Sequence, residues 1–383
     1  MVAKFPKVDV DSNLINWAID SAGWNREELF SKLNIGKKTF EEIAEGKGKL
    51  TLKQLEYLSN KTRRPIAAFF LPIPPIEKPL PTDYRMIPER EGKFDKKTIF
   101  AIRKARTLQE LSKELSANVN EKLSPIVKKA NLDDDPKTLA KYYREEVFKL
   151  GLSKRFRDDY DYYNFLRDKF EDLNIIPFQI SLPIEDARGF ALVDEIPNII
   201  VVNSADEIRP RIFSLMHEFA HVLLEKSGID MPEPNFNLRN KIELWCNHFS
   251  SEFLLPETTA IMIFKDYKEN IREPEIIKKL SNKFHVSKGM LVYKMKILNF
   301  ISSNDYNNFI EKYKKTEEKK KLAEKKGGGG IPVDKKRLSE MGNKFISLVA
   351  NNYDRDFITY SDALNYLSIK SKSFEKLLSK ARK

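Results

Sequence analysis

Apolar residues at the spacing of an amphipathic helix dominate the chain, and they predict short helices in the first 64 residues. Asn25 is placed to cap one of these helices, which would bury Leu29 and Leu33. The break that follows, Asn34-Ile35-Gly36, is short and contains a glycine, as the turn of a helix-turn-helix motif requires. The helices expected here cover residues 14–22, 25–33 and 37–45, with a fourth from residue 51.

The pattern then changes twice. Residues 64–75 are apolar and then rich in proline, which prevents a long helix. We expect them to form a hook that packs one domain against the next. Residues 81–175 are polar and charged, and Asp133-Asp134-Asp135-Pro136 is typical of a helix start. This second region predicts a connecting layer of helices.

Strand-like runs appear only after this layer. The expected strands are residues 175–180, 189–193 and 198–203. Two helices should follow, over 209–226 and 238–253, and the second should end before Pro256. Beyond them we expect helices over 275–300, 311–326 and 334–383, with a flexible break at Gly327–Gly330.

These elements predict an α+β fold: a mostly helical, multi-domain chain with one small sheet. The sheet and the two helices after it would form one domain, and helical segments would flank it on both sides. The expected domains are 1–64, 65–175 (hook and connecting region), 176–300 (with the sheet), 301–330 (charged helix and linker) and 331–383 (C-terminal helices).

Charge is distributed unevenly along the 383 residues. The formal net charge is +12. Residues 251–383 contain 28 lysines and arginines against 17 acids, a net of +11, so residues 1–250 carry the remaining +1. A basic segment of this kind favours an anionic partner, DNA or an acidic protein. A lysine-rich solvated surface is the alternative.

The single cysteine, Cys246, excludes a disulfide within the chain and favours a reducing compartment. The first residues lack the apolar core of a signal peptide. The longest apolar stretch, 65–76, is too short to span a bilayer. We therefore expect a cytoplasmic protein without a membrane partner.

The motif with the clearest chemistry is His217-Glu218-Phe219-Ala220-His221, in the helix expected at 209–226. Histidines four residues apart lie on one helix face and can bind one zinc ion, and the glutamate can take a proton from a water molecule at such a site. The sequence thus predicts a zinc site on His217 and His221 with Glu218 as general base. Two structural histidines are the alternative.

A catalytic zinc ion needs a third protein ligand and a water molecule. Glu243 lies 22 residues after His221, in the next expected helix, and Asn247 one turn later shares its face. We expect Glu243 to be the third ligand. Asn247 should accept a hydrogen bond from the far nitrogen of a ligating histidine.

Three other residues could compete for the third position. Cys246 and His248 are rotated away from the face of Glu243 and Asn247, so we expect packing or rim positions for both. His285 is expected in a turn.

These motifs resemble the ImmA/IrrE family of metallo-endopeptidases. The resemblance covers roughly residues 176–300. It implies a zincin-like (gluzincin) peptidase domain, Zn2+ bound to His217, His221 and Glu243, and strands that offer an edge to an extended substrate. Members of the family cleave a DNA-binding repressor, so the implied partner is a protein substrate, a repressor or toxin encoded nearby.

Residues 12–58 resemble an XRE/Cro-type helix-turn-helix domain, with 27–33 as its second helix and 39–46 as its third. The third helix also carries three glutamates, and acids are unfavourable among DNA phosphates. Binding of a protein instead of DNA therefore stays open. The residues expected to contact DNA are Lys37, Lys38 and Thr39.

The sequence therefore predicts a zinc endopeptidase coupled to a helix-turn-helix module, which cleaves a regulatory protein to control transcription, a stress response or a toxin–antitoxin system. The alternative is a DNA-binding regulator or antitoxin that sequesters a toxin, with the zinc site structural or idle. An open fourth position at the metal favours the first function, and a protein side chain in that position favours the second. The oligomeric state stays open, with a dimer among the options.

Overall fold

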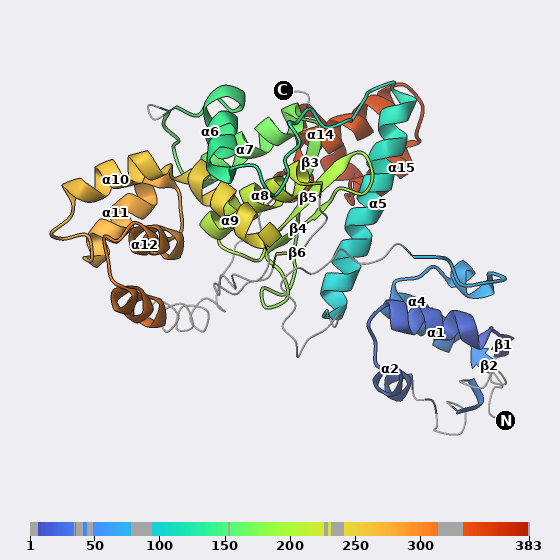
Figure 1. The fold of residues 1–383 in the computed structure, drawn as a ribbon. Coiled ribbons are helices and arrows are strands. Elements are labelled where there is room, and N and C mark those ends of the chain that lie inside the picture. The colour runs from blue at the N-terminus through green and yellow to red at the C-terminus, as the bar shows by residue number, and fades with distance from the viewer. Residues whose placement is uncertain are drawn as a thin grey trace. The chain divides into compact units, whose positions relative to one another are not determined.

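The computed structural model describes residues 7–33, 35, 41–43, 49–77, 94–151, 154–225, 229–230, 241–312 and 332–381 (Figure 1). Most of them are helical, and the strands form two small sheets. The architecture is α+β, as the sequence predicts. Within the described part, no helix is long and apolar enough to cross a membrane.

The chain divides into two compact units. The first comprises residues 1–80 and 86–104, and the second comprises 81–85 and 105–383. The long helix α5 (Lys96–Asn118) contributes its first residues to the first unit and the rest to the second.

The first unit is built from short capped helices. Asp11, Asn25 and Thr51 each accept a hydrogen bond from a backbone N–H of the helix that follows. The apolar faces of these helices meet in one core, in which Ala18 and Leu55 are fully buried. The elements are β1 (Lys7–Asp9), α1 (Ser12–Ser21), α2 (Arg26–Lys32), β2 (Lys49–Thr51), which pairs with β1 in antiparallel fashion, and α4 (Leu52–Thr62).

Most of the third helix expected in this unit lies outside the described residues, although residues 41–43 are helical. The three residues expected to contact DNA, Lys37, Lys38 and Thr39, also lie outside them. The helix-turn-helix domain therefore stays a prediction.

The proline-rich segment begins with a short 3-10 helix, η1 (Ile66–Phe70). Phe69 is buried in the core of the first unit, whereas the side chains of Phe70 and Ile73 are 53% and 70% exposed. Phe69 thus fixes this segment to the helices that precede it. The expected packing of the hook against another domain stays a prediction.

The second unit contains a four-stranded sheet in the order β3-β5-β4-β6. β3 is parallel to β5, and β4 is antiparallel to both β5 and β6. Every residue of β3, β4 and β5 is buried, as in sheets covered on both faces. Strands β3 (Ile175–Ile180), β4 (Gly189–Leu192) and β5 (Asn198–Asn203) confirm the three predicted runs, and β6 (Ile229–Asp230) was not expected.

Different helices cover the two faces of this sheet. Helices α7 (Asp159–Asp172) and α8 (Ile208–Leu223) pack on the face that carries Ile175 and Ile200. Alternate residues of a strand point to opposite faces, and Phe178 packs on the other side, with its ring centroid 5.4 Å from that of Phe345 in α14 (Val333–Asp354). The C-terminal helices, which continue with α15 (Tyr360–Tyr366) and α16 (Phe374–Ala381), thus supply one of the layers around the sheet.

The region expected to be a connecting layer forms part of the same core. Helix α6 (Pro136–Tyr142) runs into a π-helical turn (Tyr143–Val147), and the ring of Tyr143 meets that of Phe219 edge-on with centroids 5.0 Å apart. The aromatic rings of this region therefore support helix α8 from outside the sheet.

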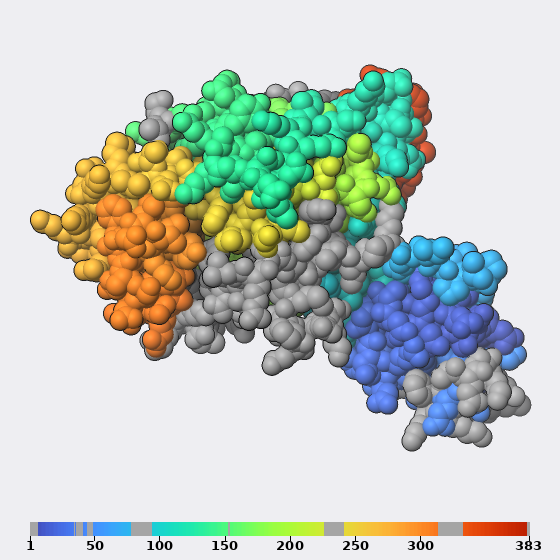
Figure 2. Space-filling model, in the orientation of Figure 1, coloured from blue at the N-terminus to red at the C-terminus, as the bar shows by residue number. Residues whose placement is uncertain are grey.

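The remaining helices follow α8 in the chain. They are α9 (Lys241–Leu254), α10 (Glu257–Asp266), α11 (Pro274–Phe284) and α12 (Lys288–Ile297). Figure 2 shows α10 to α12 exposed at the surface of the second unit. Residues 303–312 are helical, and the rest of the charged helix expected at 311–326 lies outside the described residues.

Candidate metal centre

Helix α8 places two histidines in the interior of the second unit. Its apolar residues Leu215, Phe219 and Leu223 are fully buried against the sheet and the surrounding helices. His217 and His221 lie four residues apart on the same helix and are also fully buried, with ring centroids 5.0 Å apart. The predicted helix therefore brings the two imidazoles together, away from solvent.

Helix α9 lies beside α8 and is fixed there by aromatic packing. Trp245, Phe249 and Phe253 recur every four residues, and the ring of Phe249 lies 5.9 Å from that of Phe219 in α8. The indole N–H of Trp245 donates a hydrogen bond of 2.8 Å to the backbone carbonyl of Asp134. These contacts fix the rotation of α9 and turn Glu243 toward the histidines.

Glu243 joins the two histidines in a buried cluster. Its Oε2 atom lies 3.1 Å from Nε2 of His217, and its Oε1 atom lies 3.1 Å from Nε2 of His221. Ligand atoms that share a tetrahedral zinc ion with bonds of about 2.0 Å are about 3.3 Å apart. Each of the two contacts between Glu243 and a histidine is therefore close to the spacing of zinc ligands.

The electrostatics of the cluster are unusual for a protein interior. Burial by itself raises the pKa of Glu243, but the imidazoles of His217 and His221 outweigh burial and hold that pKa well below its usual range. A divalent cation would bind such a set of nitrogen and carboxylate donors and compensate the buried carboxylate.

Asn247 lies on α9 one turn after Glu243 and is 6% exposed. The sequence predicts that it accepts a hydrogen bond from a ligating histidine. Within the described part of the chain, Nδ1 of His217 has no hydrogen-bond partner, so Asn247 forms no such bond with it. The role of Asn247 therefore stays a prediction.

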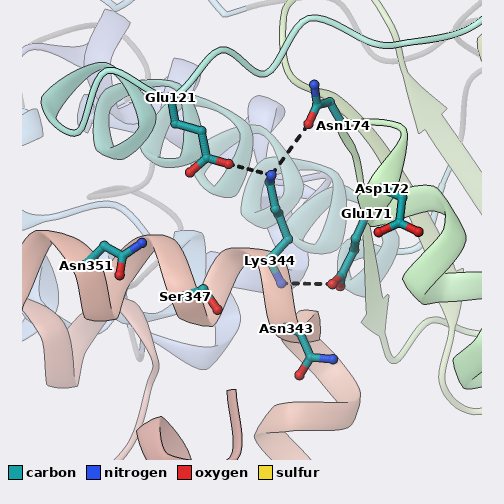
Figure 3. Close-up of a pocket in the computed structure, with 8 residues that line it drawn as sticks. All are labelled: Glu121, Glu171, Asp172, Asn174, Asn343, Lys344, Ser347 and Asn351. Atoms are coloured by element: carbon teal, nitrogen blue, oxygen red, sulfur yellow. Dashed lines mark hydrogen bonds and ion pairs between the residues drawn. The ribbon is translucent and has the colours of Figure 1, made fainter. Parts of the chain in front are cut away.

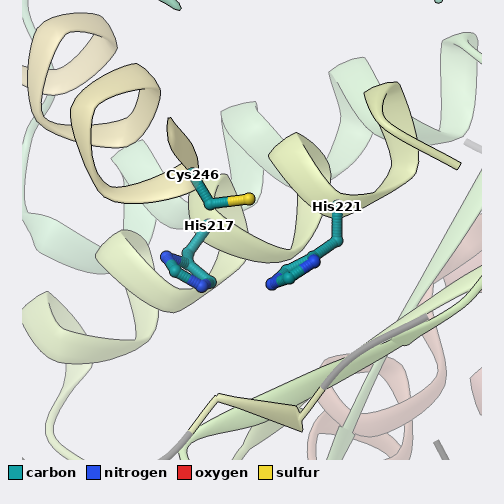
Figure 4. Close-up of side chains that lie close together, drawn as sticks. All are labelled: His217, His221 and Cys246. Carbon is teal, nitrogen blue, oxygen red and sulfur yellow. The ribbon is translucent and has the colours of Figure 1, made fainter. Parts of the chain in front are cut away.

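Cys246 lies at the cluster as well, and here the structure differs from the expectation of a packing or rim position. Its sulfur and one ring nitrogen from each of His217 and His221 all lie within 4.8 Å of one another (Figure 4). Residues three apart on a helix are separated by only about 60° of rotation, so Cys246 follows Glu243 onto the same side of α9.

Glu218 lies on α8 and is fully buried beside strand β4. A side chain at Gly189 of β4 would begin 3.1 Å from Oε1 of Glu218 and 2.8 Å from the backbone oxygen of Val201. Glycine is therefore needed at this position for β4 to pass so close to the carboxylate. Sequence reasoning missed Gly189, because a single glycine in a short strand carries no signal of what it faces.

The other two histidines lie away from the metal centre. His248 is exposed on α9. His285 adopts a left-handed conformation (φ 55°) at the end of α11, and its Nδ1 lies 2.7 Å from Oδ1 of Asp159. These positions agree with the rim and turn positions expected for them.

A polar pocket of about 400 Å³ lies between α7 and α14 (Figure 3). Its main cation, Lys344, forms an ion pair with Glu121 at 2.5 Å. None of the lining residues belongs to the metal centre, so the pocket is separate from it. The lining residues are Glu121, Glu171, Asp172, Asn174, Asn343, Lys344, Ser347 and Asn351.

Comparison with known proteins gives one finding that bears on the metal centre. No curated protein and no solved structure matches the chain. The profile of the Peptidase M78 family, described as the IrrE N-terminal-like domain, matches residues 170–296. That span includes the sheet, the HExxH helix α8 and helix α9. This part of the chain is therefore similar to a metallopeptidase domain of the IrrE type.

Proposed function

We propose that the chain is a zinc-dependent endopeptidase of the gluzincin type. The observation that carries the proposal is the buried convergence of His217, His221 and Glu243, within 3.1 Å contacts, beside Glu218 on the same helix. The match of residues 170–296 to a peptidase family supports the same chemistry.

The three side chains suit zinc, which binds imidazole nitrogens and carboxylate oxygens and commonly has three protein ligands in catalytic sites. When bound, the metal ion would polarise a scissile carbonyl and make water a stronger acid. Glu218 would accept a proton from the attacking water and return it to the leaving amine. Gly189 would leave the Glu218 carboxylate the space that this role needs.

Replacing the base tests the proposal. Glu218→Gln should bind zinc as the wild type does, and its cleavage of a proteome-derived peptide library, followed by mass spectrometry, should fall about 100- to 10,000-fold because the proton acceptor is lost. The control is Glu225→Gln, at an exposed glutamate just beyond α8. Equal cleavage by Glu218→Gln and the wild type would refute the mechanism.

We further propose that the substrate is a regulatory protein, a repressor or toxin encoded nearby, and that the N-terminal unit recognises this protein or DNA. The family match and the small helical core of the first unit support this proposal. Each neighbouring gene product can be incubated with the wild type and with Glu218→Gln, and intact masses compared. A fragment produced by the wild type alone would identify the substrate.

The alternative is a DNA-binding regulator or antitoxin whose metal centre is structural. The thiol of Cys246 near the histidines favours it, because a fourth protein ligand closes a zinc site. A mobility-shift assay with DNA from upstream of the gene separates the two: DNA binding without any cleavage supports the regulator.

A further inference from the structure

Lysines gather in helices α11 and α12, where acidic residues are missing. Residues 276–304 contain six lysines and no aspartate or glutamate. This stretch comprises most of α11, the turn at residues 285–287 and all of α12. Its charge of +6 is half of the net charge of +12 carried by the whole chain. The basic character of the C-terminal third is therefore concentrated in one pair of helices.

The lysines of this stretch differ in what they contact. Lys294 of α12 is 3% exposed, and its Nζ lies 3.0 Å from Oε2 of Glu252. Lys278, Lys279 and Lys283 of α11 are exposed, and none of them forms an ion pair in the part of the chain that the structure describes. Burial of a charge requires a partner, whereas an exposed charge is solvated by water. The three lysines of α11 thus remain available to an anion outside the protein.

Packing of α11 fixes the direction of these three lysines. Lys278, Lys279 and Lys283 fall within about 140° of rotation around the helix axis. The opposite side of α11 carries Ile277 and Leu280, which are buried in the core of the second unit. Figure 2 shows α11 at the surface of that unit. The helix therefore presents its lysines together, on the side that faces solvent.

The form of the helix pair indicates the kind of partner. A turn of three residues joins α11 to α12, as in a helix-turn-helix motif, and His285 begins it with φ 55°. In DNA-binding proteins the second helix of such a pair reads base edges. Here Val292 of α12 is buried, and the ring centroid of Tyr293 lies 5.9 Å from that of Tyr306. The exposed lysines of α11, and not α12, therefore form the surface for a phosphate backbone.

Two observations favour double-stranded nucleic acid. Lys279 and Lys283 are about 6 Å apart along the helix axis, close to the roughly 7 Å that two phosphate steps cover on one strand of a duplex. Binding of single strands relies on exposed aromatic rings that stack on the bases. No aromatic side chain in residues 257–300 is exposed. Glu275, at the start of α11, is the one acid on the exposed side of the helix.

We propose that α11 binds double-stranded DNA through its phosphates, with Lys278, Lys279 and Lys283 as the contacts and without reading the base sequence. This surface is distinct from the first unit, to which the proposed function assigns recognition of DNA or protein. The inference does not depend on the peptidase chemistry.

The lysine surface belongs to the same unit as the metal centre. Arg209, in the first turn of α8, donates hydrogen bonds of 2.7 Å to the hydroxyl of Ser281 and to Oδ1 of Asn282 in α11. Helix α8 also carries both histidines of the metal centre. DNA bound at α11 is therefore held by the unit that contains the metal centre.

Fluorescence anisotropy of the full-length protein with two short labelled duplexes of unrelated sequence provides the test. The wild type should bind both equally, with a dissociation constant of about 10⁻⁴ to 10⁻⁶ M at physiological salt. The triple variant Lys278→Gln/Lys279→Gln/Lys283→Gln should bind both at least about 10-fold more weakly. The slope of log K against log salt concentration should fall by about 3, because each lost phosphate contact contributes about one.

The matched control is Lys335→Gln/Lys370→Gln/Lys372→Gln, which removes the same charge from exposed lysines of the C-terminal helices. It should bind both duplexes nearly as well as the wild type. An equal loss in the control would show that net charge, and not α11, governs binding. Wild-type affinity in the α11 variant would place the DNA contacts elsewhere, and the inference would be wrong.

Three further outcomes would overturn the inference and leave the proposed peptidase standing. One is a wild type that binds neither duplex. Another is a preference for one duplex that the α11 variant abolishes, because it would show that this surface reads bases. The third is binding of labelled polyglutamate that depends on the three lysines, with no binding of DNA, which would identify an acidic protein as the partner.

Discussion

Two clusters of buried polar side chains in the second unit differ in the groups that their charged atoms contact. The metal centre gathers two histidines and a carboxylate from α8 and α9, and their polar atoms point at one another. The contact between α7 and α14 also buries charges, Arg167 and Glu171, but these point at backbone groups. The side chains of the first cluster contact one another, whereas those of the second contact the backbone on either side of a break in a helix.

The α7–α14 contact arises from a break in α14. Gly342 has φ 77° and ψ 167°, which interrupts the helix. The guanidinium of Arg167 donates to the carbonyls of Leu338 and Ser339 before the break, and Glu171 accepts from the backbone N–H of Lys344 after it, at 2.9 Å. Positive charge at a helix C-terminus and negative charge at an N-terminus are both stabilising.

A binding site and a structural support differ in what their buried charges contact. Both clusters are almost completely excluded from solvent, so burial alone does not separate them. What differs is the destination of the polar atoms: convergence on a common point indicates a ligand, and pairing with open helix ends indicates structure. A substitution in one cluster should therefore leave the property that depends on the other cluster unchanged.

Loss of a metal ligand should have the largest effect. His217→Ala and His221→Ala should each weaken zinc binding by well over ~100-fold, because each variant removes a residue that binds the metal directly. A loss of up to ~100-fold is typical when only a residue that hydrogen-bonds to a metal ligand is removed. Competition with a chromophoric chelator measures the affinity. The exposed His248→Ala should bind zinc as the wild type does, and a similar loss there would contradict the assignment of the centre.

Replacement of Gly342, at the break in α14, should have the next largest effect. It should change the free energy of unfolding and leave zinc binding unchanged. Gly342→Ala forces a side chain into a conformation that favours glycine and against the carboxylate of Glu171. We expect a loss of about 4 kcal/mol in the free energy of unfolding, from backbone strain and overpacking together. Gly289→Ala, where a methyl group meets nothing within 4 Å, should be neutral or slightly stabilising in the same urea titration. Zinc binding to the folded Gly342 variant should be unchanged.

Glu171 should make the stability depend on pH. Burial raises its pKa to about 7 despite the nearby Arg167. The folded chain therefore holds this proton more tightly than the unfolded chain, so its contribution to stability is full below about pH 4.5 and is lost as the pH rises to about 7, up to about 3 kcal/mol. Urea midpoints at pH 5 and pH 7.5 should thus differ less in Glu171→Gln than in the wild type.

The neighbouring Asp172→Asn, at an exposed carboxyl, is the control for this pH dependence. It should retain the wild-type difference between the two pH values. A Glu171→Gln variant with the same pH dependence as the wild type would show that Glu171 does not titrate in this window.

A small change at Gly189 should separate catalysis from metal binding. The methyl group of Gly189→Ala would meet Oε1 of Glu218 and the backbone oxygen of Val201, so either β4 or the carboxylate must move. A displacement of about 1 Å at a catalytic group costs about 100-fold in rate. We expect that loss in peptide-library cleavage, with zinc affinity retained. Loss of zinc instead would place Gly189 among the supports of the metal ligands.

Much of the second unit could be predicted from the sequence. The strands at 175–180 and 198–203 are runs rich in β-branched and apolar residues, and the structure has both with the same bounds. His217 and His221 lie four residues apart on one helix, and this spacing alone places them close together. Their proximity could therefore be predicted without knowledge of the tertiary structure. Glu243 was expected near the histidines because a catalytic zinc ion needs a third protein ligand. In the structure its carboxylate contacts both His217 and His221.

Other features could not be predicted because they depend on contacts between distant segments. The rotation of α9 is set by packing of Phe249 against Phe219 of α8, and this rotation brings Cys246 to the histidines. The break at Gly342 is stabilised by α7, about 170 residues earlier in the chain. The layer that α14 forms on β3 depends on the same long-range contacts.

The sequence by itself determined the local arrangement of this site: the helix that carries His217 and His221, Glu218 beside them, and the carboxylate at Glu243. These follow from helical spacing and from the donors that zinc prefers. Only the tertiary structure decided which neighbours join them, Cys246 from the side of α9 and Gly189 from β4. The physical reason is that helical spacing is local, whereas the rotation and approach of one element to another are fixed by side-chain packing across the whole core.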